Sequence, residues 1–287
     1  MESSVRWAVN FGNWQPIRSE WLLAGRCIQP EEKARISRFV YKKDAKAAMV
    51  IGRLMLRKLI NEYLKIEYSQ VRLDRTEKGK PFLVNELPAG SSSLNFNLSH
   101  NGKYVVLAGE PKFQVGIDVM RANSLGGKTV ASFFHTMARQ FTRDEWTSIL
   151  NPGEEMQQLS RFYRFWCLKE SYVKAVGVGI GFNIQRLNFA IKSEKIEKGS
   201  TKCDTRLAID EKETSDWIFE ETMLDDCHCI AVALGKNPDD DIKVFSKHKP
   251  QDFKLLNFSD LVINSSPWQP EDESFWTDFC DRDETPK

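Results

Sequence analysis

The order of apolar and polar residues along the chain predicts helices and strands in both halves. Residues 44–63 place alanine, methionine, leucine and isoleucine at helical spacing, with basic residues on the opposite face, which predicts a long helix. Residues from about 159 to 176 predict a second long, aromatic-rich helix, and Gly177 is its expected C-terminal stop. Shorter helices are predicted at 133–140 and from Thr142 onward, where two acidic residues suit a first helical turn.

Strands are predicted between these helices. Residues 94–98 alternate leucine or phenylalanine with asparagine, and this period of two is typical of a half-buried strand. Residues 99–102, with the sequence Ser-His-Asn-Gly, have the composition of a turn. Apolar or alternating runs predict the remaining strands at 71–73, 104–108, 114–120, 182–191, 205–209, 217–220 and 228–234.

The two halves share an order of elements. Each has a long helix, and each ends with a histidine followed by an apolar strand, His100 in the first half and His228 in the second. We therefore expect an α+β fold of two similar lobes, with a ligand site in the cleft between them. The expected units are residues 1–111, residues 112–236 and a tail of residues 237–287.

The tail is polar and charged, and its aromatic residues lie among acidic ones. We expect it to be partly disordered, with the aromatic side chains packing back on the body. Binding of a partner protein is the alternative for this segment.

Composition excludes several classes of protein. The chain has 287 residues with 41 basic and 40 acidic side chains, so it has no excess charge to attract nucleic acid or a membrane surface. No apolar run approaches the roughly 20 residues that span a bilayer, and the N-terminus lacks the apolar centre of a secretory signal. The six scattered cysteines suit a reducing compartment, so we expect a cytosolic protein.

Three adjacent residues, Cys227, His228 and Cys229, raise the question of a metal site. They lead into an apolar run that predicts a buried strand, in which successive side chains point to opposite faces. We therefore expect His228 to turn away from both cysteines, and two thiols alone do not make a closed zinc site.

Candidate chemistry centres on two carboxylates and a lysine. Glu170 and Lys174 are four residues apart in the second long helix and share one of its faces. An exposed ion pair is the common alternative for such spacing. Asp118 lies near the end of an apolar strand, where it is either a turn cap or one partner of a cation. Asp118 and Glu170 together offer the hard oxygen ligands that suit Mg²⁺.

Candidate anion-binding residues lie in the first half. Arg75, Lys78 and Lys80 surround Gly79, and such a loop suits a phosphate, although a solvated basic turn has the same composition. His100 follows Ser99 and offers donors at the end of a strand, although a lone histidine is more often structural.

The order of these motifs resembles that of the Sfp-type 4′-phosphopantetheinyl transferases. The resemblance covers about residues 5–235. It rests on Lys78-Gly79-Lys80-Pro81, Asn97-Leu98-Ser99-His100, Gly116-Ile117-Asp118, Phe141-Thr142 with Glu145-Trp146, and Trp166-Cys167-Leu168-Lys169-Glu170-Ser171 with Lys174-Ala175.

The resemblance implies two similar α+β lobes with coenzyme A between them, and transfer of its phosphopantetheine arm to a serine of a carrier protein with release of adenosine 3′,5′-bisphosphate. By motif, Arg35, Arg75 and His100 would contact the 3′-phosphate, Asp118 and Glu170 would hold Mg²⁺, and Lys174 would neutralise the pyrophosphate. The nucleotide would be lined by Arg75, Thr76, Glu77, Lys78, Gly79, Lys80, Asn97, Leu98, Ser99 and His100.

Several points stay open under this resemblance. Glu170 would accept the serine proton, directly or through a water, and a water held by the ion is the rival base. Many bacterial members have a second acid where this chain has Met120, so that ligand place would go to water or to Asn101. The expected partners are carrier domains of the fatty acid synthase and aminoadipate reductase type, and a monomer is expected. The alternatives are a non-catalytic coenzyme A or carrier-protein binding module, and a scaffold whose tail recruits partners.

Overall fold

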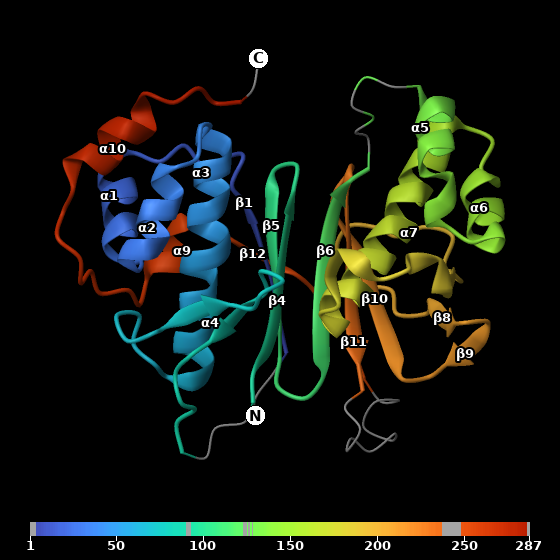
Figure 1. Ribbon diagram of the computed structural model, residues 1–287, viewed down its shortest axis with the longest axis horizontal. Coiled ribbons are helices and arrows are strands. Elements are labelled where there is room, and N and C mark those ends of the chain that lie inside the picture. Colours follow the sequence, from blue (N-terminus) through green and yellow to red (C-terminus); the bar gives the residue numbers. More distant parts are fainter. Residues whose placement is uncertain are drawn as a thin grey trace.

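The computed structural model describes residues 4–89, 93–122, 125, 127, 129–236 and 248–285. It is a mixed α and β structure, as predicted, in which two main sheets lie side by side with helices on their outer faces (Figure 1). Apolar side chains from both sheets, among them Val106, Ile117 and Val232, form a buried cluster where the sheets meet. This packing explains why so many strand residues are apolar on both faces.

The first sheet has the strand order β12-β1-β5-β4, and the second has the order β10-β11-β6. Neighbouring strands are antiparallel, except that β12 runs parallel to β1. The bounds are β1 Val5–Asn10, β4 Asn95–Asn101, β5 Tyr104–Glu110, β6 Gln114–Arg121, β10 Trp217–Asp225, β11 His228–Gly235 and β12 Lys254–Leu256. Two smaller sheets contain β2 Leu73–Arg75 with β3 Pro81–Leu83, and β7 Leu187–Ala190 with β8 Arg206–Ile209 and β9 Lys212–Thr214.

The helices of the first half are α1 Arg18–Arg26, α2 Pro30–Ser37, α3 Lys42–Met49 and α4 Met55–Leu64. The predicted helix at 44–63 is confirmed, but the π-helical turn η1, Val50–Leu54, joins α3 to α4. The basic residues expected on a separate face are instead buried: Lys46, Arg53, Arg57 and Lys58 are at most 5 % exposed. Burial is tolerated where partners exist, as for Arg57, which donates to the carbonyl oxygens of Tyr68 and Val71.

The helices of the second half are α5 Val130–Met137, η2 Ala138–Gln140, α6 Arg143–Leu150 and α7 Glu155–Val176. Thr142 caps α6 by accepting the N–H of Glu145, while the Glu145 carboxylate accepts the N–H of Thr142. The α7 helix begins four residues before the predicted start and ends at Val176, and its C-cap Gly177, with a φ of 75°, confirms the predicted stop.

Several strand predictions were wrong in extent. The predicted strand at 182–191 is only β7, because the chain first forms the 3₁₀ turns η3 Gly179–Gly181 and η4 Ile184–Arg186, the latter capped by the side chain of Asn183. The predicted turn at 99–102 is confined to its last residues, because Ser99 and His100 pair with β5 as part of β4. Gly102, with a φ of 60°, is in the turn.

The segment 248–285 packs against the helices of the first half, and residues 237–247 of the predicted tail lie outside the described residues. Besides β12, it contains α9 Phe258–Val262 and α10 Glu273–Cys280. The ring of Phe279 stacks 4.0 Å from Trp21, and Phe275 stacks at 5.3 Å. Among the described residues, no helix has the length and apolarity that crossing a membrane requires.

Candidate active site

The site begins with an unusually close approach between β6 and α7. A Cβ atom added to Gly116 would lie 2.0 Å from the carbonyl oxygen of Ser171 and 2.3 Å from the amide nitrogen of Ala175. Only glycine permits this contact. Asp118 follows two residues later on the same face of β6 and therefore also meets α7.

The Asp118 carboxylate is 4 % exposed and has two different oxygen environments. Its Oδ1 lies 2.6 Å from Lys174 Nζ and accepts a hydrogen bond from Ser99 Oγ at 2.7 Å. Lys174 Nζ also donates to Ser99 Oγ at 2.7 Å. The Oδ2 atom is buried without a hydrogen-bond partner in the described part of the chain. A buried carboxylate oxygen of this kind is a fitting ligand for a cation.

Glu170 lies one helical turn before Lys174 on α7. Burial and the nearby charge of Asp118 raise the pKa of Glu170, while Lys174 opposes the shift. The charge of Asp118 therefore disfavours the ionised form of Glu170. A divalent cation between them would remove that repulsion, and carboxylate oxygens are the donor type that Mg²⁺ takes.

A cavity of about 730 Å³ lies beside these residues. Its wall joins α7 to residues from the first half of the chain; Asp118 and Ser99 are not part of the wall but bond to Lys174, which is. Of the predicted site residues, the cavity is lined by Arg35, Arg75, Lys78, Gly79, Lys80, Asn97, Leu98, His100, Glu170 and Lys174. Thr76 and Glu77 are exposed outside it, although Thr76 Oγ1 accepts the N–H of Lys80 and so shapes the loop.

The basic loop is held in place by hydrogen bonds to backbone carbonyls. Arg75 donates to the carbonyl of Gly79 at 2.7 Å, and Lys78 donates to Val178 at 2.9 Å, which connects the loop to the end of α7. Burial and the nearby Arg35 lower the pKa of Arg75. Burial also lowers the pKa of His100, and Lys174 adds to this effect, so the imidazole is neutral at pH 7 without a bound anion.

One charged residue of the cavity wall, Arg53, was not predicted as a site residue from the sequence. Arg53 lines the cavity from η1, and Trp166 and Phe182 supply apolar surface from the second half. The helical spacing of residues 44–63 assigned Arg53 to the basic face, and the π turn is the feature that redirects the chain there. Asn101 was predicted as a possible ligand in place of the acid that is absent at Met120. Its side-chain oxygen accepts a hydrogen bond from the N–H of Arg121.

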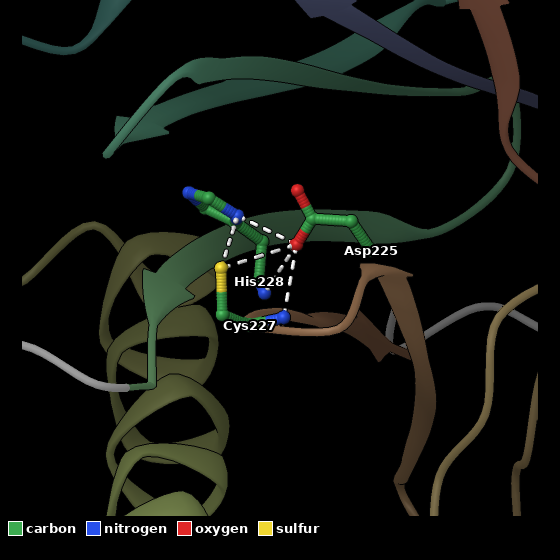
Figure 2. A group of neighbouring side chains, drawn as sticks. All are labelled: Asp225, Cys227 and His228. Atoms are coloured by element: carbon green, nitrogen blue, oxygen red, sulfur yellow. Dashed lines mark hydrogen bonds and ion pairs between the residues drawn. The ribbon is translucent and has the colours of Figure 1, made fainter.

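A second group of candidate ligand atoms belongs to Asp225, Cys227 and His228 (Figure 2). The expectation that His228 turns away from both cysteines is wrong for Cys227, because Cys227 precedes β11 and its thiol lies 3.4 Å from His228 Nδ1. Asp225 Oδ1 accepts the N–H groups of Cys227 and His228 and lies 2.8 Å from His228 Nδ1. His228 Nε2 accepts the N–H of Lys103, which leaves the proton on Nδ1. These bonds organise the turn between β10 and β11.

Comparison with known proteins agrees with the geometry. A model of the 4′-phosphopantetheinyl transferase N-terminal region matches residues 12–112, and a model of the 4′-phosphopantetheinyl transferase superfamily matches residues 114–233. The L-aminoadipate-semialdehyde dehydrogenase-phosphopantetheinyl transferase of Homo sapiens is 48% identical over 98% of this chain and 93% of its own length. The chain belongs to the 4′-phosphopantetheinyl transferase superfamily.

Other phosphopantetheinyl transferases are similar over different lengths. The Xenopus laevis protein with the same name as the human one is 43% identical over 99% of the chain. The 4′-phosphopantetheinyl transferase Sfp of Bacillus subtilis is 26% identical over 58% of the chain. The family resemblance and the enzyme class predicted from the motifs are thereby confirmed.

Proposed function

We propose that this phosphopantetheinyl transferase moves the phosphopantetheine arm of coenzyme A to a serine hydroxyl of an apo carrier domain and releases adenosine 3′,5′-bisphosphate. One observation carries the proposal. The cavity is lined by Glu170 and by Lys174, which is paired with Asp118, and also by Arg35, Arg53 and Arg75. Coenzyme A likewise has a pyrophosphate and a separate 3′-phosphate, so each charged group finds a matching part of the wall.

Asp118 and Glu170 would hold a divalent cation, Mg²⁺ by donor type. The Oδ2 of Asp118, which has no hydrogen-bond partner among the described residues, and the raised pKa of Glu170 support this assignment. When bound, the ion supplies positive charge to the pyrophosphate oxygens. Lys174 adds a second positive charge at the same place and, with Ser99, orients the Asp118 carboxylate.

The transfer forms one phosphorus–oxygen bond and breaks another. The serine oxygen bonds to the phosphorus that carries the pantetheine arm, and the bond from that phosphorus to the bridging oxygen breaks. The electron pair leaves with adenosine 3′,5′-bisphosphate. Glu170 accepts the serine proton, directly or through a water, and a raised pKa suits a carboxylate to that role. Positioning and charge neutralisation provide most of the rate enhancement in such transfers.

We also propose that the chain forms two similar lobes, residues 1–111 and 112–236, related by a pseudo-two-fold axis, with the substrate in the cleft between them. The similar order of helix and strand in the two halves supports this proposal, as does the cavity wall with residues from both. The third unit is the tail, residues 237–287, and its described part, residues 248–285, would brace the first lobe.

The partners we propose are carrier domains of the aminoadipate reductase type and of fatty acid synthase. The names of the human and Xenopus relatives, which contain L-aminoadipate-semialdehyde dehydrogenase, support the first of these. We also propose that the protein is a monomer in the cytosol, and the six free thiols support the reducing compartment.

The mass of a purified apo carrier domain, measured after incubation with coenzyme A, Mg²⁺ and this protein, tests the proposal. A gain of one phosphopantetheine is expected with wild type and with Glu155→Gln, a control at the exposed start of α7. Glu170→Gln is expected to abolish the gain. A non-catalytic binding module would bind coenzyme A without changing the carrier mass, and full transfer by Glu170→Gln would refute the assigned base.

A further inference from the structure

Arg53 has an unusual environment for a buried arginine. It lies in the π-helical turn η1 between α3 and α4, is 5 % exposed, and forms part of the cavity wall. π turns inserted in helices frequently occur at functional sites because the extra residue redirects a side chain. Here that side chain is a guanidinium.

The hydrogen bonds of this guanidinium are incomplete. Its Nε is buried without a hydrogen-bond partner among the described residues, and the carboxylate of Glu32 approaches it only to 3.5 Å. Arg57, one turn later, also has a buried Nε without a partner among the described residues, but its Nη groups hydrogen-bond two backbone carbonyls as well as Gln29 and Glu32. The Glu32 carboxylate is therefore shared and bonds mainly to Arg57. A buried donor without a partner is costly, and Arg53 has donors to offer a ligand.

The charges around Arg53 also indicate that an anionic ligand binds here. Burial lowers the pKa of Arg53 to about 10, Glu32 opposes this shift, and Arg75 and Arg35 add to it. Arg75 in turn has its pKa lowered by burial and by Arg35. Three guanidinium groups thus converge at one part of the cavity, and the Glu32 carboxylate favours the charge of Arg53 and Arg75. Positive charge that is concentrated in this way is unfavourable until an anion enters.

We propose that Arg53 is a specificity-determining residue that binds the 3′-phosphate of coenzyme A together with Arg35 and Arg75. The inference rests on the proposed function and adds a residue that the family motifs do not contain. In the free enzyme the three cations repel one another, and binding of the phosphate removes this repulsion. Arg53 thereby makes the affinity of the enzyme for coenzyme A depend on the 3′-phosphate.

The other phosphates of the substrate fit a different part of the wall. Lys174 is paired with Asp118, whereas the cations that act on Arg53 are Arg35, Arg57 and Arg75. The pyrophosphate is therefore assigned to Lys174 and the isolated phosphate to the arginines.

Steady-state transfer with coenzyme A and with dephospho-coenzyme A tests the assignment. Arg53→Met keeps side-chain length and removes the charge. It is expected to lower kcat/KM for coenzyme A by about tenfold to a hundredfold, the effect of one charge-assisted hydrogen bond. The value for dephospho-coenzyme A is expected to change by less than about twofold. Arg53→Lys should recover part of the loss, and Arg38→Met, on the exposed end of α2, should resemble wild type. An equal loss for both substrates would overturn the inference.

Thermal unfolding distinguishes the proposed role of Arg53 from a purely structural one, because the two roles predict opposite changes in the unfolding temperature of Arg53→Met. Without ligand, Arg53→Met is expected to unfold at or above the wild-type temperature because one repelling buried charge is gone. Adenosine 3′,5′-bisphosphate should stabilise wild type more than adenosine 5′-monophosphate does, and the variant should lose that difference. A variant that unfolds at a lower temperature and keeps the difference would overturn the inference. Wild type could fail to modify a carrier domain and still be stabilised more by adenosine 3′,5′-bisphosphate than by adenosine 5′-monophosphate in a way that depends on Arg53. That result would refute the proposed function and leave the anion site supported.

Discussion

Replacing Gly116 with alanine is the sharpest test of how the fold positions the site. The added Cβ would lie 2.0 Å from the carbonyl oxygen of Ser171 and 2.3 Å from the amide nitrogen of Ala175. Because both are backbone atoms of α7, no rotamer change relieves the clash, and β6 and α7 must separate by about 1.4 Å to reach ordinary contact. Overpacking of this kind costs about 2–3 kcal/mol. The melting temperature should fall by about 4–10 °C.

The same separation would move Glu170 and Lys174 away from Asp118. A misplacement of about 1 Å costs on the order of a hundredfold in rate, so transfer should fall by about that factor even in the folded fraction. Differential scanning calorimetry and the carrier mass assay measure the two effects. Gly153→Ala is the matched control because its Cβ meets nothing within 4 Å. Wild-type stability and rate in Gly116→Ala would refute the argument that the glycine sets the site.

Three further predictions concern charge and packing. Burial raises the pKa of Glu170, so ionisation of its carboxyl destabilises the folded protein as the pH rises above the ordinary carboxyl range. Without metal, Glu170→Gln should have a higher melting temperature than wild type at pH 8 and the same melting temperature at pH 4. A lower melting temperature of the variant at pH 8 would contradict this prediction. Although burial opposes it, hydrogen bonds from Cys227 and His228 lower the pKa of Asp225 to about 2. Asp225→Asn should therefore be less stable than wild type at pH 6, with a difference that disappears as pH falls through about 2, and a pH-independent difference would argue against this origin. Phe279→Ala removes the ring stacked on Trp21 and should cost about 3–5 kcal/mol in urea unfolding; an unchanged midpoint would show that α10 adds no stability.

The sequence was most informative where one periodic pattern determined one element. The apolar spacing of residues 159–176 and the glycine at 177 predicted α7, and the largely apolar residues 114–120 predicted the strand that carries Asp118, although Asp118 lies inside β6 and not near its end. Both features depend only on residues that are close together in the sequence. The motif residues then identified most of the cavity wall, since Arg75, His100, Glu170 and Lys174 all line it.

Contacts between distant segments were not predictable in the same way. Ser99 and His100 have turn composition, but pairing with β5 satisfies their backbone groups in a strand. Arg53 has the spacing of a solvent-facing residue, and the π turn that redirects it leaves no mark in the helical period. The pairing of Lys174 with Ser99 and Asp118 joins three elements, so sequence distance concealed it.

Direct binding of a divalent ion tests the central claim that Asp118 and Glu170 share one cation. Mn²⁺ serves as the probe, and electron paramagnetic resonance measures the free ion during titration of the protein with coenzyme A present. We expect one tight site in wild type that is lost in both Asp118→Asn and Glu170→Gln, with coenzyme A binding retained. Undiminished Mn²⁺ binding by either variant would contradict the claim.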